Sequence, residues 1–328
     1  MDIHYVIFGH LTREFLLPPT GQPRLDMPGG SLLYAAAGLG AWESGVGLVG
    51  CVGNDYPRAW LNDMKLRGFD TTGIRILSKN IDVREFVAYN DLFEANRVNP
   101  ISHFARREMT FPKSLLGYQP ENKIDEECRL TVRDIPDEYL SARAAYLCPM
   151  HLVTQTQLIA GLKRGRVHSF ILDPSPATMT PTSRRELPAL LNGVTVFLPS
   201  EEEIRNLFQS ETHDLWEMAE AVSLYGCEYV VIKRGKDGQL LYNATTKEKW
   251  EIPAYTARIE DVTGAGDAFG GGFAAGFSKN YDPLEGALYG NVSASLNIEG
   301  HGALHPLDVM PGLAEARLSA LKDMVRKV

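Results

Sequence analysis

Short hydrophobic runs rich in β-branched residues alternate with amphipathic stretches along most of this chain of 328 residues. The runs have the length of buried strands, and the stretches between them have the three-to-four-residue spacing of helices. Strands connected in this way pair in parallel, because each connection has to cross back over the sheet. We therefore predict an α/β fold with a mainly parallel, doubly wound sheet flanked by helices. The predicted strands are residues 3–9, 46–52, 143–149, 168–173, 194–198 and 228–233.

Two segments, residues 11–28 and 82–112, interrupt this alternation. The second continues into a polar stretch to about residue 130 and contains strand-like runs such as residues 83–89. Since no repeat or low-complexity tract divides the sequence, we predict a single domain, residues 1–328. The second segment also carries a basic cluster, which is either part of a solvated loop or a contact for an anionic group of a substrate. This cluster consists of His103, Arg106, Arg107 and Lys113.

A glycine-bounded turn at residues 264–266 stands directly before Asp267 and opens an apolar helix. The glycines leave the backbone free to point N–H groups outward, and the helix adds the positive end of its dipole, so the turn can hold an anion. The same dipole favours an ionised carboxylate at Asp267, which could accept a proton from a hydroxyl group. The alternative interpretation is purely structural: the glycines form a packing turn, and Asp267 is an acidic residue in the first turn of the helix.

Three more glycines, Gly270, Gly271 and Gly272, lie within the same predicted helix. Each costs roughly 1 kcal/mol of helix stability relative to alanine. We therefore expect close backbone contact on at least one side of this helix.

The segment Asp261-Val-Thr-Gly-Ala-Gly-Asp-Ala-Phe269 resembles the signature Asp-Thr-Thr-Gly-Ala-Gly-Asp-x-Phe of the ribokinase-like, or PfkB, carbohydrate kinases. Only Val262 departs from it. The resemblance implies that Asp267 is the catalytic base, that Gly264, Ala265 and Gly266 form an anion hole, and that ATP and Mg²⁺ are the cofactors. Asp261 and Thr263 match positions near which many members bind a monovalent cation, so potassium is an expected activator.

The acceptor half of the family pattern is also present. Gly29 and Gly30 precede a helix of small residues at 32–42, and in the family such a Gly-Gly pair is pressed against the sugar. Two positions differ, because Tyr34 stands where a sugar-binding Asn is usual and Glu14 takes the place of a sugar-binding aspartate. By the resemblance, all four residues bind the acceptor.

The nucleotide half follows in the expected order. Ser200 and Glu203 match the Asn and Glu of the family's Pro-Asn-x-x-Glu motif, whose glutamate organises the magnesium ion. Lys233 and Gly235 match a Lys-x-Gly that contacts the nucleotide, and Asn291 matches an adenine-side position. Taken alone, Glu203 is a helix-start acid and Lys233 a solvated strand-end lysine.

The resemblance also gives a role to the interrupting segments 11–28 and 82–112. In the family they pair into a small β-sheet that covers the sugar as a lid, and we expect a homodimer to form through it. A lid excludes water, which would otherwise take the phosphoryl group.

Composition and charge exclude several other classes of protein. The net charge of −8 argues against nucleic acid or an anionic membrane as a partner. The four cysteines are far apart in the sequence and predict neither a zinc site nor disulfides, and no membrane span or leader is apparent, so we expect a cytoplasmic setting. A Gly-x-Gly-x-x-Gly spacing at residues 45–50 lies within a strand-like run, which is the wrong context for a dinucleotide-binding dehydrogenase.

The sequence is thus interpreted as an ATP-dependent sugar kinase that transfers the γ-phosphoryl group of ATP to a hydroxyl of a small carbohydrate or polyol. A nucleoside or inositol kinase of the same family and a catalytically silent ligand-binding relative are the alternatives.

Overall fold

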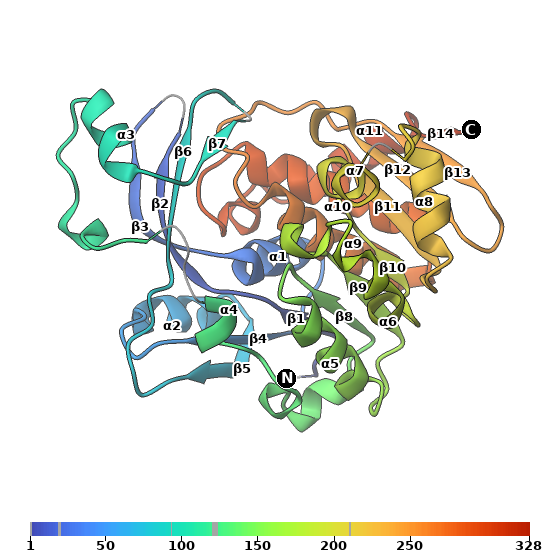
Figure 1. The fold of residues 1–328 in the computed structure, drawn as a ribbon, viewed down its shortest axis with the longest axis horizontal. Helices are drawn as coiled ribbons and strands as arrows, with labels where there is room; N and C mark the ends of the chain where they lie inside the picture. Colours follow the sequence, from blue (N-terminus) through green and yellow to red (C-terminus); the bar gives the residue numbers. More distant parts are fainter. Residues whose placement is uncertain (1, 19–20, 93, 120–123, 210) are drawn as a thin grey trace.

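The fold is organised around a sheet of ten strands among the residues described by the computed structural model, which are 2–18, 21–92, 94–119, 124–209 and 211–328 (Figure 1). The strand order is β14-β13-β12-β11-β10-β9-β8-β1-β4-β5. Neighbouring strands from β11 to β5 pair in parallel, and β12, β13 and β14 add an antiparallel extension. The strands are β1 (Tyr5–Phe8), β4 (Val46–Val52), β5 (Asp70–Ile76), β8 (Ala144–Leu147), β9 (Ser169–Leu172), β10 (Val196–Phe197), β11 (Tyr229–Lys233), β12 (Gln239–Asn243), β13 (Lys249–Ile252) and β14 (Arg326–Lys327).

Helices flank this sheet, and those that carry the glycine-rich segments pack against one another (Figure 1). The helices are α1 (Ser31–Gly40), α2 (Arg58–Leu66), α3 (Pro100–Arg106), α4 (Ile124–Glu127), α5 (Leu152–Leu162), α6 (Leu187–Leu191), α7 (Glu201–Phe208), α8 (Leu215–Ser223), α9 (Ala265–Asn280), α10 (Pro283–Ile298) and α11 (Leu313–Lys322). In the described part of the chain, none of them is both long and apolar enough to cross a lipid bilayer.

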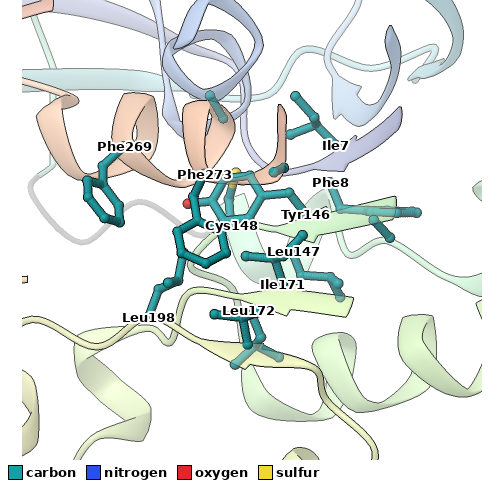
Figure 2. Close-up of a cluster of buried hydrophobic side chains, with 14 of the residues drawn as sticks. Ile7, Phe8, Tyr146, Leu147, Cys148, Ile171, Leu172, Leu198, Phe269 and Phe273 are labelled. Atoms are coloured by element: carbon teal, nitrogen blue, oxygen red, sulfur yellow. The ribbon is translucent and has the colours of Figure 1, made fainter. Parts of the chain in front are cut away.

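The main hydrophobic core lies where α9 covers the parallel strands. Figure 2 shows Phe273 of α9 beside Tyr146 of β8 and Leu172 of β9, and all three side chains are almost completely buried. Because parallel strands are covered on both faces, they read in the sequence as continuous apolar runs. This is why six strands of the large sheet could be predicted.

A second, four-stranded sheet projects from the body of the molecule in the order β3-β2-β6-β7 (Figure 1). Its strands are β2 (Thr12–Leu17), β3 (Arg24–Gly29), β6 (Arg84–Tyr89) and β7 (Ala95–Asn96). One face packs Phe15, Leu17 and Phe86 against Phe104 of α3, which lies on the outer side. The opposite face packs Leu16, Val87 and Tyr89 against Val262, which lies just before the glycine turn.

The predicted fold class is confirmed, and all six predicted strands are present. The two interrupting segments contribute the small sheet. The glycine run at residues 45–50 belongs mainly to β4, as its strand-like pattern indicated. Strands β5, β12, β13 and β14 were not predicted.

Candidate active site

The turn before Asp267 owes its shape to Gly264. This residue caps α9 in the left-handed conformation, with φ of 71°, which glycine adopts without strain. Its backbone lies directly against the ring of Tyr34, since a Cβ atom at this position would fall 2.1 Å from two ring carbons. The turn therefore leaves no room for another residue at 264, and Ala265 begins the helix.

The glycines inside α9 are in close contact with three different elements, as expected. A Cβ atom on Gly271 would lie 2.0 Å from the carbonyl oxygen of Ala35 in α1, and one on Gly270 would lie 2.1 Å from the ring of Tyr146. Gly272 meets Ser293 of α10 in the same way. Helix α9 thus gives up intrinsic stability to bring the N-terminal turn and Asp267 close to α1, β8 and α10.

A cavity of about 600 Å³ extends from this turn. Its size suits a nucleotide-sized ligand. It brings together eight of the predicted site residues from four places in the sequence, and its lining includes Ser200, Glu203, Lys233, Gly235, Ala265, Gly266, Asp267 and Asn291. The acceptor-side residues Glu14, Gly29, Gly30 and Tyr34 do not line it.

Asp267 does not have the low pKa that its place at the helix start suggested. Burial and the nearby charge of Asp173 raise its pKa to about 7, and this outweighs the opposing effect of Lys233. The dipole argument missed this because it considered only α9 and not the opposing strand. A carboxylate with a pKa near 7 suits a general base at neutral pH.

Asp173 is a residue of the site that the sequence analysis missed. It follows β9, is 2% exposed, and accepts hydrogen bonds from Lys233 Nζ and from the Tyr146 hydroxyl, the latter at 3.1 Å. Burial raises its pKa to about 6 despite the ion pair with Lys233. A signal was available, because an acid at the carboxyl end of a predicted parallel strand lies where ligands of such sheets bind.

Lys233 differs from its simplest interpretation, whereas Glu203 is a helix-start acid, as its simplest interpretation gave. The Lys233 side chain is only 14% exposed, so it is not a solvated strand-end lysine. Glu203 closes a capping box, in which Oε2 accepts from the Ser200 backbone N–H at 2.7 Å and from its hydroxyl at 2.9 Å. The Glu203 side chain also lines the cavity, and its Oε1 is left outside the capping box.

Asn291 lines the cavity, but its amide group is engaged with the chain itself. Its Nδ2 donates to Gln239 Oε1 and to the Pro253 carbonyl, both at 2.8 Å, and its Oδ1 accepts from the Tyr255 N–H at 2.9 Å. Asn291 therefore holds residues 253–255 in place beside the cavity.

The four acceptor-side residues lie together on the other side of the turn. Glu14 and Tyr34 are each 2% exposed, and the Tyr34 hydroxyl donates to Glu14 Oε2 at 2.8 Å. The Gly30 N–H donates to Glu14 Oε1 at 2.9 Å. Burial raises the pKa of Glu14, and these two hydrogen bonds oppose that effect.

The loop that leads into the turn is fixed by the small sheet and by helix α10. Asp261 is 6% exposed, and its Oδ1 accepts from the Thr263 N–H at 2.9 Å. The Thr263 hydroxyl is 2.7 Å from the Tyr89 hydroxyl of the small sheet, and the Thr263 carbonyl accepts from Asn297 Nδ2 at 2.8 Å. Asn297 Oδ1 is buried and has no hydrogen-bond partner among the described residues.

The basic cluster of the second interrupting segment is divided, because Arg106 and Lys113 are exposed, as in a solvated loop, and the other two residues are engaged with the chain. Arg107 donates to the backbone carbonyls of Pro18, Leu17 and Tyr89, and so joins the ends of two strands. His103 is buried against Phe86 on the outer side of the small sheet. These two residues serve the packing of the sheet and are not available to a substrate anion.

A parallel sheet with a cavity at its strand ends, a glycine turn at a helix N-terminus and a carboxylate beside it define a kinase of small molecules. The sequence profile described as pfkB family carbohydrate kinase matches residues 139–310. The chain is 30% identical over 283 residues to the cytidine kinase of Thermococcus kodakarensis, which covers 85% of this chain and 90% of the relative. The chain belongs to the pfkB family of carbohydrate kinases, and the predicted enzyme class, an ATP-dependent kinase, is confirmed.

Two further relatives extend this comparison. The ribokinase of Staphylococcus aureus is 28% identical over 179 residues, which cover 51% of this chain and 56% of that one. The crystal structure of a putative ribokinase II from E. coli in complex with ATP and Mg²⁺ has a TM-score of 0.72 at 17% identity, and the match covers 97% of this chain and 99% of that one. The similarity in fold thus extends over almost the whole chain.

Proposed function

We propose that this enzyme transfers the γ-phosphoryl group of ATP to a hydroxyl of a small sugar, with Asp267 as the general base and the backbone of residues 264–266 as the anion hole. The position of Asp267 carries this proposal. It lines the nucleotide-sized cavity directly after the glycine turn, and its pKa of about 7 allows it to accept a proton at neutral pH.

The residues present fit ATP and Mg²⁺. Lys233 brings a positive charge to the cavity, where phosphate groups need one. Glu203 and Asp173 supply two carboxylates, and Mg²⁺ in nucleotide sites is usually held by one or two carboxylates together with phosphates. When bound, the ion offsets the negative charge of the phosphates. The chain's own part is to position the phosphoryl group on the 264–266 amides and to remove the proton of the attacking hydroxyl.

A nucleoside is the second candidate acceptor. The relative that covers 85% of this chain is named for cytidine, whereas the ribokinase covers 51%. Inositol stays a further alternative, and a catalytically silent relative is disfavoured by Asp267 beside an intact anion turn. A coupled assay of ADP release over pentoses, hexoses, polyols and nucleosides distinguishes these acceptors.

The test of the mechanism is Asp267→Asn, which keeps the shape of the side chain but cannot accept the proton. We expect kcat to fall by at least about 10²-fold, with little change in ATP binding. Turnover close to that of the wild type would exclude Asp267 as the base.

A melting curve provides the control for folding. The pKa of Asp267 is about 7 in the folded protein against 3.8 for an unperturbed aspartate. The ionised carboxylate therefore destabilises the fold, and this effect grows as the pH rises from 4 through 7. Asp267→Asn should accordingly raise Tm at pH 8, and the gain should shrink at pH 5.

Potassium activation is also part of the proposal. The buried carboxylate of Asp261 and the unpartnered Asn297 Oδ1 both lie at the loop around Thr263 and could serve as oxygen ligands. We expect KCl to raise kcat and to raise Tm relative to choline chloride at equal ionic strength. Asn297→Leu should abolish both differences, and their persistence in that variant would place the cation elsewhere.

A further inference from the structure

Glu14 and Tyr34 make their hydrogen bonds to the chain itself and not toward an open site. Both carboxylate oxygens of Glu14 are engaged, one by the Tyr34 hydroxyl at 2.8 Å and the other by the Gly30 N–H at 2.9 Å. Both side chains are 2% exposed. Each oxygen of this buried carboxylate therefore has a donor from the chain itself.

The two glycines of this group are also in close contact with the chain's own atoms. A Cβ atom on Gly29 would lie 2.0 Å from the carboxyl carbon of Glu14, and one on Gly30 would lie 2.4 Å from the His10 carbonyl oxygen. Gly29 therefore makes room for the carboxylate of Glu14. The close contacts of both glycines are made with atoms of the chain itself and require no bound acceptor.

The Tyr34 ring closes the space between Glu14 and the catalytic turn. It lies against the backbone of Gly264, while the nucleotide cavity lies on the side of the turn lined by Ala265, Gly266 and Asp267. In an in-line transfer the acceptor approaches from the side opposite the leaving nucleotide. On that side the ring of Tyr34 lies against Gly264, and its hydroxyl end is bonded to Glu14.

We infer that Tyr34 is a specificity-determining residue, which limits the depth of the acceptor site and keeps the acceptor away from Glu14. This inference rests on the proposed function, because it assumes that the acceptor hydroxyl reaches Asp267. Glu14 is then the hydrogen-bond partner of the Tyr34 hydroxyl, and the ring is kept in place by its packing against Gly264. The ring itself, rather than its hydroxyl, is what restricts the acceptor.

Two substitutions separate the ring from the hydroxyl. Tyr34→Phe keeps the ring and removes the hydrogen bond to Glu14, so the ranking of acceptors by kcat/KM should stay as in the wild type. Tyr34→Asn removes the ring and opens the space in front of Glu14. We expect it to raise kcat/KM for larger or more hydroxylated acceptors at least tenfold relative to the best wild-type acceptor, with the KM for ATP within about threefold.

The outcomes are distinct. If Tyr34→Phe changes the acceptor ranking as much as Tyr34→Asn does, the hydroxyl is an acceptor ligand and the inference is wrong. An unchanged ranking in Tyr34→Asn would show that Tyr34 does not bound the acceptor site. A rise in the Tm of each variant on addition of ATP shows that the variant is folded. If Tyr34→Asn does not fold, the double variant Glu14→Gln/Tyr34→Asn replaces it. Absence of ADP release by the wild type with every acceptor would overturn the proposed function instead.

Discussion

At the scale of single residues, the charge of Asp173 disfavours ionisation of Asp267. Lys233 forms its ion pair with Asp173 and only partly offsets the effect at Asp267. Asp173 thus binds Lys233 in an ion pair, and Asp267 keeps a pKa near neutral pH. The neighbouring carboxylate of Asp173 thus helps to set the pKa of Asp267.

Removal of the Asp173 charge should lower the pKa of Asp267. In Asp173→Asn the repulsion is gone and Lys233 is left to favour the ionised base, so the acid limb of the pH profile of kcat should move to lower pH. The profile of Glu202→Gln serves as the control, because it removes an exposed charge from the start of the same helix as Glu203. A limb that stays in place in Asp173→Asn, or that moves upward, would contradict this account.

The sequence pointed to the turn at residues 264–266 and to Asp267 as the proposed base, but it could not give the pKa of Asp267. Asp267 was identified from a local motif, whereas its ionisation depends on Asp173, which is 94 positions earlier in the chain. Glu14 and Tyr34 were found by their positions in the family pattern. Their mutual hydrogen bond is a product of tertiary packing, and no spacing in the sequence predicts it.

At the scale of elements, helices α1 and α9 approach closely enough for backbone to touch backbone. Gly38 of α1 faces the carbonyl of Ala268, and Gly271 of α9 faces that of Ala35, so the two helices contact each other through glycines from both sides. This contact fixes the N-terminus of α9, and with it the anion turn, relative to Tyr34.

Two glycines of α1 give a matched test of this contact. Gly38→Ala would place a Cβ atom 2.2 Å from a backbone oxygen, which cannot move aside, so we expect a loss of about 2 kcal/mol or more in the free energy of unfolding. Gly40→Ala meets only the ends of Leu307 and Phe69, at 3.0 and 3.1 Å, and should change stability by less than about 1 kcal/mol. Urea unfolding measures both, and equal losses would show that the backbone contact is unimportant.

The strands that could be predicted are buried on both faces of the sheet, which gives them continuous apolar runs in the sequence. Strand β5 was missed because its sequence, DTTGIRI, is polar and contains a glycine, as suits a strand at the edge of the sheet. Strands β12 and β13 were missed because they follow β11 through short turns as antiparallel neighbours. The alternation of strand and helix that guided the prediction ends at this point.

At the scale of the whole molecule, the small sheet is joined to the catalytic loop. The Tyr89 hydroxyl is bonded to that of Thr263 at 2.7 Å, and Val262 packs on Leu16 and Val87. The role of this sheet as a lid stays a prediction, as does a homodimer formed through it. Helix α3 and the segment after it lie over the outer face, and they carry exposed apolar side chains such as Ile101 and Leu116 that such a dimer would cover.

If the small sheet acts as a lid, cutting its bond to the catalytic loop should let water compete with the acceptor. We expect Tyr89→Phe to raise ATP hydrolysis per acceptor phosphorylated by about fivefold, the equivalent of one hydrogen bond of about 1 kcal/mol. Tyr118→Phe is the matched control, because the Tyr118 hydroxyl bonds to the Phe86 N–H of the same strand. Tight coupling in Tyr89→Phe, or looser coupling in the control, would count against the lid.

The saturated amide of Asn291 has a consequence for which nucleotides this enzyme consumes. Gln239 Oε1 accepts from Asn291, and the Ser295 hydroxyl is bonded to the Val292 carbonyl and to Arg317, so these side chains of the cavity wall direct hydrogen bonds to the chain itself. Such a wall selects a purine by its shape and not by its exocyclic groups. Guanosine and inosine triphosphates should then serve nearly as well as ATP, and the rate in a cell would follow the total pool of purine triphosphates rather than its adenylate fraction.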